Sequence, residues 1–281
     1  MKVIGTEASQ VLASRIADEL GTAVVDVKFS RFPDGELYVC AGGLDEEMVI
    51  VGSIVDSDSL VQLLLLIDSC ENSHNRLIIP YMGYARQDKR FKAGEPVSAR
   101  AVALAVSRGA AACITVNIHD KKVNSYFGIP STDVSLAPDI GTHIKKMDLD
   151  DPLILAPDDG ATVFAETVAA VGNWDCDHLD KTRISGDEVR MAHKNLSAAK
   201  RSVVIVDDII STGGTIATAA ALLASQGARD VHAACVHGVF TNGAYARLKA
   251  AGIREVVCSD TIERGCSQYS AALRIAGALG R

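Results

Sequence analysis

The chain alternates short apolar runs with longer segments in which apolar residues recur at helical spacing. The runs are rich in β-branched residues and only a few residues long, which is typical of strands buried on both faces of a parallel sheet. The longer segments place apolar residues three and four positions apart, which favours helices that cover such a sheet. The alternation therefore predicts an α/β fold of mainly parallel sheets flanked by helices.

The same pattern divides the chain into two halves that follow one plan, although no clear sequence repeat is visible. The polar segment 139–151 lies between Pro138 and Pro152. We therefore predict two similar domains, residues 1–143 and 144–281, each of ordinary domain size. The predicted strands span residues 24–27, 48–54, 76–80, 113–118, 153–156, 202–206, 231–236 and 255–258. The predicted helices span residues 8–20, 59–69, 97–107, 162–170, 215–225, 244–250 and 270–280.

Composition narrows the class of protein. Of the 281 residues, 48% are hydrophobic and only 5% are aromatic, which suits α/β layers better than a β-sandwich. The formal net charge of -7 at pH 7 argues against a general nucleic-acid-binding protein, because such a protein needs a basic face. The seven cysteines show no CxxC spacing and indicate reduced thiols, not a disulfide framework or a zinc site.

Targeting signals are also not apparent in the sequence. The N-terminal residues lack the basic and apolar regions of a signal peptide. The longest apolar run, residues 63–67, is too short to cross a bilayer. We therefore expect a cytoplasmic protein without a membrane partner.

The most informative segment is a predicted strand that is followed by two carboxylates and a loop of small residues. Residues 203–206 form a β-branched run, and Asp207 and Asp208 come directly after it. The next loop leads into an apolar helix, so its N–H groups can surround a phosphate at a helix N-terminus. Carboxylates repel phosphate but accept hydrogen bonds from sugar hydroxyls, so the segment predicts a ribose 5-phosphate site. The loop residues are Ser211, Thr212, Gly213, Gly214 and Thr215.

The alternative for this segment is an ordinary strand, turn and helix with incidental acidic residues. Paired acids at the end of an apolar strand are costly unless they are used, which favours the binding site. The segment is neither a Walker A loop nor a Rossmann fingerprint. Because neighbours on a strand point to opposite faces, we expect only one of Asp207 and Asp208 to contact the sugar directly.

Two further segments carry charge where phosphate chemistry needs it. The predicted strand 153–156 is followed by Asp158, Asp159 and Gly160, where a carboxylate can hold Mg²⁺ and loop N–H groups can bind a pyrophosphate. The alternative there is a plain turn. Later, Lys181 and Arg183 stand two apart in a short basic segment, so they can converge on one phosphate if it is extended. The alternative there is alternating charge on a surface loop.

The segment 207–215 resembles the ribose-phosphate loop of the type I phosphoribosyltransferase fold. Together with the other motifs, it makes the whole chain resemble the ribose-phosphate pyrophosphokinases, or PRPP synthases. Residues 31–38 resemble that family's Phe-x-Asp-Gly-Glu signature, which can equally form a type I or II turn. Residues 80–90 resemble its Tyr-Ala-Arg-Gln-Asp motif. The resemblance implies that ATP is bound by Phe32, Asp34, Glu36, Arg86, Gln87 and Asp88.

The resemblance also implies a metal site and a catalytic loop. His119 follows the predicted strand 113–118, and the family's matching histidine coordinates Mg²⁺ at the ATP phosphates together with an acid that corresponds to Asp158. From the residues alone, a histidine at a strand end is more often structural, since Mg²⁺ prefers oxygen. The segment with Lys181 and Arg183 resembles the family's catalytic flexible loop, with 184–188 as its mobile arm.

The chain departs from the family pattern at several positions. Phe91 and Lys92 stand where bacterial and eukaryotic members carry a further acid, and Ser211 stands where many of them carry aspartate. Asp159 and Ala161 also differ from the usual small residue and glycine of the pyrophosphate loop. The serine and the shorter chain look more like the archaeal branch. The resemblance further implies a homo-oligomer.

The implied reaction transfers the β,γ-pyrophosphoryl group of Mg-ATP to the 1-hydroxyl of ribose 5-phosphate, giving AMP and PRPP. A phosphoribosyltransferase is the nearest alternative, but it needs only one such domain. A non-catalytic regulatory homologue should lack the basic loop or the metal ligands, which are present here. A repressor on this fold should carry a basic N-terminal DNA-binding segment, which is absent.

Overall fold

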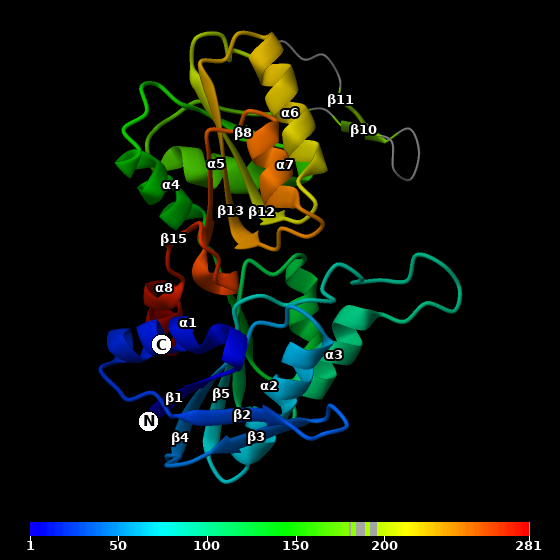
Figure 1. Cartoon of the computed structure of the whole chain (residues 1–281), viewed down its shortest axis with the longest axis vertical. Helices are drawn as coiled ribbons and strands as arrows, with labels where there is room; N and C mark the ends of the chain where they lie inside the picture. The colour runs from blue at the N-terminus through cyan, green and yellow to red at the C-terminus, as the bar shows by residue number, and fades with distance from the viewer. Residues whose placement is uncertain (180, 184–188, 192–195, 281) are drawn as a thin grey trace. The chain divides into compact units, whose positions relative to one another are not determined.

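The chain folds into two compact units in the computed structural model, which describes residues 1–179, 181–183, 189–191 and 196–280 (Figure 1). The first unit comprises Met1–Ser135, Thr261–Glu263 and Ser270–Arg281. The second unit comprises Leu136–Asp260 and Arg264–Tyr269. In the described residues, no helix is long and apolar enough to cross a membrane.

The first unit is built on a parallel five-stranded sheet with the order β1-β4-β5-β6-β7. Its strands are β1 (Lys2–Gly5), β4 (Glu47–Val51), β5 (His74–Ile79), β6 (Ala112–Val116) and β7 (Ser131–Val134). An antiparallel hairpin is formed by β2 (Val27–Arg31) and β3 (Leu37–Ala41). The helical elements are η1 (Glu7–Ser9), α1 (Gln10–Leu20), α2 (Ser57–Ser69), α3 (Ser98–Val106), η2 (Lys121–Tyr126) and α8 (Ala272–Leu279).

The second unit is built on a parallel six-stranded sheet with the order β15-β14-β13-β12-β8-β9. Its strands are β8 (Leu153–Ala156), β9 (Cys176–His178), β12 (Ser202–Ile210), β13 (Asp230–Gly238), β14 (Glu255–Ser259) and β15 (Ser267–Tyr269). A separate antiparallel pair is formed by β10 (Lys181–Arg183) and β11 (Val189–Met191). The helical elements are α4 (Ala137–Lys146), η3 (Asp159–Ala161), α5 (Thr162–Ala170), α6 (Gly214–Ser225), α7 (Ala244–Ala250) and η4 (Asp260–Ile262).

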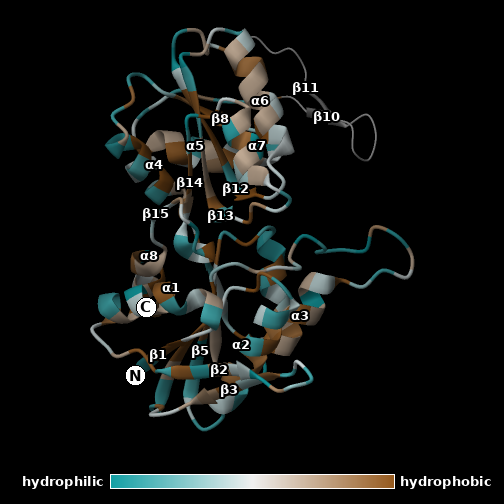
Figure 2. Ribbon diagram, in the orientation of Figure 1, coloured by the Kyte–Doolittle hydropathy of each residue, from teal (hydrophilic) through white to brown (hydrophobic). Residues whose placement is uncertain are grey.

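The two cores explain why the apolar runs become strands. Leu77, Ile78 and Ile79 of β5 are all fully buried, as are Val203 and Ile205 of β12. Hydrophobic colour runs along the central strands of both sheets in Figure 2. Each fully buried aliphatic side chain contributes roughly 1.5–3 kcal/mol relative to exposure. The predicted class, parallel sheets covered by helices, is confirmed.

The units do not follow the boundary predicted between residues 143 and 144. The segment expected to separate the domains contains most of α4, because Ile140 and Ile144 are buried against the second unit, where α4 packs on α5. The C-terminal helix α8 belongs to the first unit. It packs on α1, and its Leu279 carbonyl accepts a hydrogen bond from the Arg76 guanidinium at 2.7 Å.

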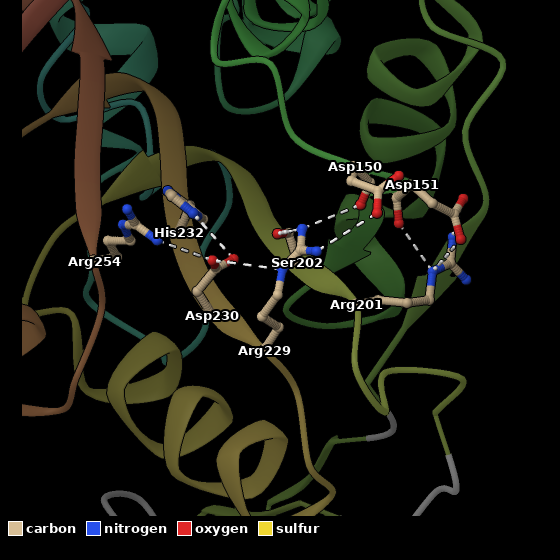
Figure 3. A network of polar contacts seen from close by, with 8 residues as sticks. All are labelled: Asp150, Asp151, Arg201, Ser202, Arg229, Asp230, His232 and Arg254. Carbon is tan, nitrogen blue, oxygen red and sulfur yellow. Dashed lines mark hydrogen bonds and ion pairs between the residues drawn. The ribbon is translucent and has the colours of Figure 1, made fainter.

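Charged residues form a network where the strands of the second sheet begin (Figure 3). Asp230 lies 3.2 Å from Arg254 and 3.3 Å from Nε2 of His232. Burial opposes ionisation of Asp230, but Ser202, His232 and Arg229 together hold its pKa below the usual range. Burial also opposes ionisation of His232 and lowers its pKa, although the nearby Asp230 and Glu255 act to raise it. His232 is therefore a structural residue of the core.

We expect acid to destabilise the second unit through His232. A buried histidine with a lowered pKa stays neutral in the folded chain, whereas the unfolded chain takes up a proton below about pH 6.5. The free energy of unfolding should therefore be fully retained above that pH and fall as the pH drops below it. His232→Gln should flatten this decline in denaturant titrations between neutral and mildly acidic pH. The exposed His74, changed to Gln, should leave it unaltered, and equal slopes in all three proteins would contradict this assignment.

Candidate active site

Strand β12 carries both carboxylates of the predicted ribose site. The strand is longer than predicted, because it continues past Val206 and pairs with β13 as far as Ile210. Asp207 and Asp208 therefore lie within the strand, near its C-terminal end. Ligands of parallel α/β sheets bind at this end of the strands.

The acidic loop after β8 reaches the same edge of the sheet. Ile205 of β12 is paired with Leu155 of β8 in parallel register. Asp208 and Asp158 each follow these partners by three residues, so they lie at a similar level along the sheet, Asp208 still within β12 and Asp158 just beyond the end of β8. The structure thus brings together the predicted ribose-binding and pyrophosphate-binding segments of the second unit.

Negative charge is concentrated at this edge. Burial, then the carboxyl of Asp208, then that of Asp158 raise the pKa of Asp207 well above its usual range. The backbone N–H of Asp208 donates to Oδ1 of Asp207 at 2.9 Å and partly offsets the shift. The two neighbouring carboxyls interact although alternate strand positions face opposite sides. A bound cation, or a ligand that donates hydrogen bonds, would relieve this accumulation of charge.

The loop after β12 has the geometry of a phosphate cradle. Gly213 adopts a φ of 71° as the residue before α6, which favours glycine, and a Cβ there would lie 3.2 Å from the Leu248 side chain. The Arg247 guanidinium donates to the carbonyl of Thr212. The N–H groups of the first turn of α6 are oriented toward its N-terminal side, where an anion can bind.

The loop after β8 forms a short helical turn before α5. Asp158 is half-buried and precedes η3, whose Ala161 N–H donates to the Asp158 carbonyl at 3.2 Å. Asp159 and Gly160 are exposed within that turn. The Thr162 hydroxyl is buried and lacks a hydrogen-bond partner among the described residues. Sequence reasoning missed Thr162, because a threonine that begins a helix looks like an ordinary capping residue.

In the first unit, the hairpin between β2 and β3 presents the Phe-x-Asp-Gly-Glu segment. The N–H of Gly35 donates to the Phe32 carbonyl at 2.9 Å, which closes a turn. Asp34 does not adopt a positive φ, so the turn is type I, and Gly35 follows it with a φ of 96°. Phe32 is 49% exposed, and its ring lies at right angles to that of Tyr38, with the ring centroids 5.7 Å apart. Glu36 is exposed beside it.

The segment after β5 is held in a tight, uncommon conformation. A Cβ on Gly83 would lie 2.3 Å from the Ile54 carbonyl oxygen, so only glycine fits. Tyr84 follows with a φ of 65°, and its hydroxyl lies 2.8 Å from that of Ser57. Arg86 is exposed, whereas Gln87 is half-buried and accepts a hydrogen bond from Ser98.

Asp88 of this segment is tied to the loop that carries His119. The Lys122 ammonium lies 2.5 Å from Oδ2 of Asp88 and 2.9 Å from Oδ2 of Asp120. The hydrogen bond from Lys122 lowers the pKa of both carboxyls. The Tyr126 hydroxyl also donates to the Asp88 carbonyl at 3.0 Å. The buried Asp88 thus anchors the segment, and His119 stands exposed beside the anchor.

The remaining predicted groups are only partly described. Lys181 and Arg183 belong to β10, which is extended as the prediction requires. The expected mobile arm, residues 184–188, lies outside the described residues. His119 belongs to the first unit and Asp158 to the second, so their joint coordination of a metal stays a prediction. Among the described residues, no group of three or more His, Cys, Asp or Glu side chains could by itself hold a metal ion.

Comparison with known proteins assigns a domain family to each part of the chain. Residues 1–108 match the N-terminal domain of ribose phosphate pyrophosphokinase, and residues 138–272 match the phosphoribosyl transferase domain. The ribose-phosphate pyrophosphokinase of Methanosarcina mazei is 48% identical over 282 residues, which cover 99% of this chain and 95% of the relative. The chain belongs to the ribose-phosphate pyrophosphokinase family.

Further relatives agree with this family. The ribose-phosphate pyrophosphokinase of Methanosarcina acetivorans is 47% identical over the full length of both chains. The crystal structure of phosphoribosylpyrophosphate synthetase from Mycobacterium smegmatis is similar, with a TM-score of 0.84 and 28% identity over 99% of this chain and 97% of that chain. The predicted likeness to archaeal pyrophosphokinases is confirmed by relatives of 38% to 48% identity.

Proposed function

We propose that this chain is a ribose-phosphate diphosphokinase, which transfers the β,γ-pyrophosphoryl group of ATP to the 1-hydroxyl of ribose 5-phosphate. The proposal rests on one observation. The carboxylates at the C-terminal end of β12 lie just before the glycine-containing loop that begins α6. There Asp207 and Asp208 can accept hydrogen bonds from sugar hydroxyls, and the loop 211–215 can bind the 5-phosphate. The names of the archaeal relatives support the reaction.

The first unit supplies the nucleotide site in this proposal. The exposed ring of Phe32 can stack on adenine, while Asp34 and Glu36 accept from its amine or from a ribose hydroxyl. Arg86 is exposed next to the anchored Asp88, and its planar guanidinium suits phosphate oxygens. The Asp88 carboxylate is buried and paired with Lys122, and its predicted contact with ATP stays a prediction.

Magnesium fits the donor chemistry of the second unit. Burial and then the neighbouring carboxylates raise the pKa of Asp207, and the buried hydroxyl of Thr162, four residues after Asp158, offers a further oxygen. Mg²⁺ commonly takes only one or two protein ligands and completes its shell with water and phosphate oxygens. We propose that Asp158 and His119 hold it. When bound, Mg²⁺ neutralises charge on the phosphates of ATP.

The residues of the chain then act mainly by position and charge. The loop at 211–215 and the paired carboxylates fix the sugar so that its 1-hydroxyl faces the β-phosphorus of ATP. Lys181 and Arg183 stabilise the negative charge that the transferring group spreads over its oxygens in the transition state. The proton of the 1-hydroxyl leaves as the bond to phosphorus forms, and AMP departs on the opposite side.

We also propose a homo-oligomer in the cytoplasm, without a nucleic-acid or membrane partner. All seven cysteines are free thiols, which is the state expected in a reducing compartment. Sedimentation of the purified protein with and without ATP tests the oligomer.

The decisive experiment incubates the purified protein with ATP, Mg²⁺ and ribose 5-phosphate and separates AMP from ADP. We expect AMP and PRPP in equal amounts. Formation of ADP would replace the proposal by a simple kinase on this fold. Absence of both products from a correctly folded, ligand-binding protein would favour a regulatory homologue that needs an active partner subunit.

We expect Lys122→Met to weaken ATP use without affecting the sugar site. Loss of the ammonium leaves Asp88 buried without its ion pair and frees the segment that carries Arg86. The KM for ATP should rise by about tenfold, equivalent to ~1.4 kcal/mol, with the KM for ribose 5-phosphate unchanged. Lys122→Arg keeps the positive charge, so its KM for ATP should return close to that of the parent. Lys121→Met serves as the matched control. Parallel changes in both KM values would instead indicate general unfolding.

A further inference from the structure

Three cysteines lie close together in the second unit, and Cys235 is the strand partner of Asp207. Cys235 of β13 and Cys258 of β14 are paired in parallel register. Cys266 lies just before β15, and its carbonyl accepts a hydrogen bond from the Cys258 N–H at 3.0 Å. The sulfur atoms of Cys258 and Cys266 are 3.6 Å apart.

We propose that Cys258 and Cys266 form a redox-active thiol pair, which hydroperoxides convert to an intramolecular disulfide with Cys266 as the attacking thiol. The sulfur atoms are already in van der Waals contact, so a bond of about 2.05 Å requires them to approach by roughly 1.5 Å. Their backbones are held side by side by the hydrogen bond between adjacent segments, which keeps this approach within the reach of small side-chain rotations.

The two thiols have different environments, which assigns their roles. Cys266 is half-buried, and the Cys258 thiol that donates to it, together with the nearby Arg264 guanidinium, lowers the pKa of Cys266 to about 7. Cys258 is buried, and its pKa is raised because it keeps its proton in that hydrogen bond and lies in an apolar site. A thiolate at neutral pH on the more accessible partner makes Cys266 the nucleophile and Cys258 the resolving thiol.

The chemistry balances with hydrogen peroxide as the oxidant. The Cys266 thiolate attacks one peroxide oxygen, the O–O bond breaks, and the departing hydroxide takes a proton to become water. This leaves a sulfenic acid on Cys266. The Cys258 sulfur then attacks the Cys266 sulfur, the S–O bond breaks, and hydroxide leaves with the Cys258 proton as a second water. The two thiols lose two electrons in total, and the peroxide gains them.

The other cysteines lack this combination. Burial raises the pKa of Cys70, Cys113 and Cys235. Burial also raises the pKa of the half-buried Cys176 to about 11. Cys40 is exposed, so it can react with oxidant, but it belongs to the first unit, whereas both thiols of the pair belong to the second. Oxidation of the pair is therefore expected to be selective.

The position of the pair gives the disulfide a structural consequence. Cys258 and Cys266 stand at the two ends of the segment 259–265, whose central residues Thr261–Glu263 belong to the first unit. Within that unit, Ser53 donates to the Thr261 carbonyl at 2.5 Å. A disulfide would close this short loop and reduce the freedom of the unfolded chain, so the oxidised protein should unfold at a higher temperature than the reduced protein.

The test treats the full-length reduced protein with one equivalent of hydrogen peroxide at neutral pH and maps its disulfides by mass spectrometry without reduction. We expect a peptide in which Cys258 is linked to Cys266, and reversal by a dithiol reductant. Cys258→Ser should accumulate a sulfenic acid on Cys266 that dimedone traps, and Cys266→Ser should give neither product. Cys176→Ser, the matched control for a half-buried thiol, should oxidise as the parent does.

Two outcomes would overturn the proposal. One is an unmodified pair in the parent protein after peroxide has oxidised the exposed Cys40. The other is disulfides that join only separate chains. Mapping the parent protein decides both, so the result does not depend on the folding of any variant. The readout is thiol chemistry, so it is independent of the proposed pyrophosphokinase activity.

Discussion

Replacing Asp207 and Asp208 together by asparagine is expected to abolish ribose 5-phosphate binding and at the same time to stabilise the fold. The carboxylates accept from the sugar hydroxyls in the proposed complex, and the amides offer a weaker and differently oriented set of acceptors. In the free protein, however, burial and the surrounding carboxyls raise the pKa of Asp207, so ionisation at neutral pH costs stability. Removing that charge should increase the free energy of unfolding by on the order of 1 kcal/mol.

The pH dependence provides an independent check of the same residue. A carboxyl whose pKa is raised by folding contributes stability below its unfolded pKa of about 3.9, and this contribution is lost as the pH rises through the folded value. The parent protein should therefore gain less stability than the double variant as the pH rises above about 4. Denaturant titrations at several pH values measure this difference.

Calorimetry separates the binding effect from a folding defect. The double variant should still bind ATP, because the proposed nucleotide contacts are in the first unit. Asp148→Asn removes an exposed carboxylate at a positive φ that asparagine tolerates, and it should change neither binding nor stability. Equal loss of both ligands, or a double variant less stable than the parent, would contradict the assignment of this edge.

The sequence was most informative where apolar runs are long or fully buried. The strand 153–156 and the helices 162–170 and 244–250 have the predicted bounds, since each is a continuous apolar or amphipathic segment with clear ends. The edge strands β7, β9 and β15 were not predicted. They have three or four residues and few fully buried side chains, so neighbouring strands and not local pattern determine them.

Some features of the candidate site could be predicted from the sequence, and others could not. Segments that carry their chemistry within ten residues, such as 207–215, could be identified from the sequence, and the structure shows the expected strand, loop and helix. The ion pair of Lys122 with Asp88 could not be identified, because the partners are distant in sequence and meet only through the packing of η2 beside the segment after β5. The effect of Asp158 on the pKa of Asp207 could not be predicted either, because these two residues are also distant in sequence.

The second large effect is expected at Lys181. Lys181→Ala should lower turnover by roughly two to three orders of magnitude, because in the proposed mechanism the Lys181 ammonium acts mainly on charge that develops in the transition state. Binding of ATP and ribose 5-phosphate should change little, since we propose that other segments make those contacts. Thr182→Ala, which alters the intervening residue of β10, is the matched control and should leave turnover within a few-fold of the parent.

Single-turnover kinetics and equilibrium binding together test this role. Lys181→Arg keeps the positive charge on a side chain of different shape and should recover part of the lost turnover. If the variant Lys181→Ala turned over substrate nearly as fast as the parent, the proposed catalytic role of β10 would be wrong. A loss of ATP affinity as large as the loss of turnover would instead mean that Lys181 binds the ground state, because a group that stabilises only the transition state lowers kcat without weakening substrate binding.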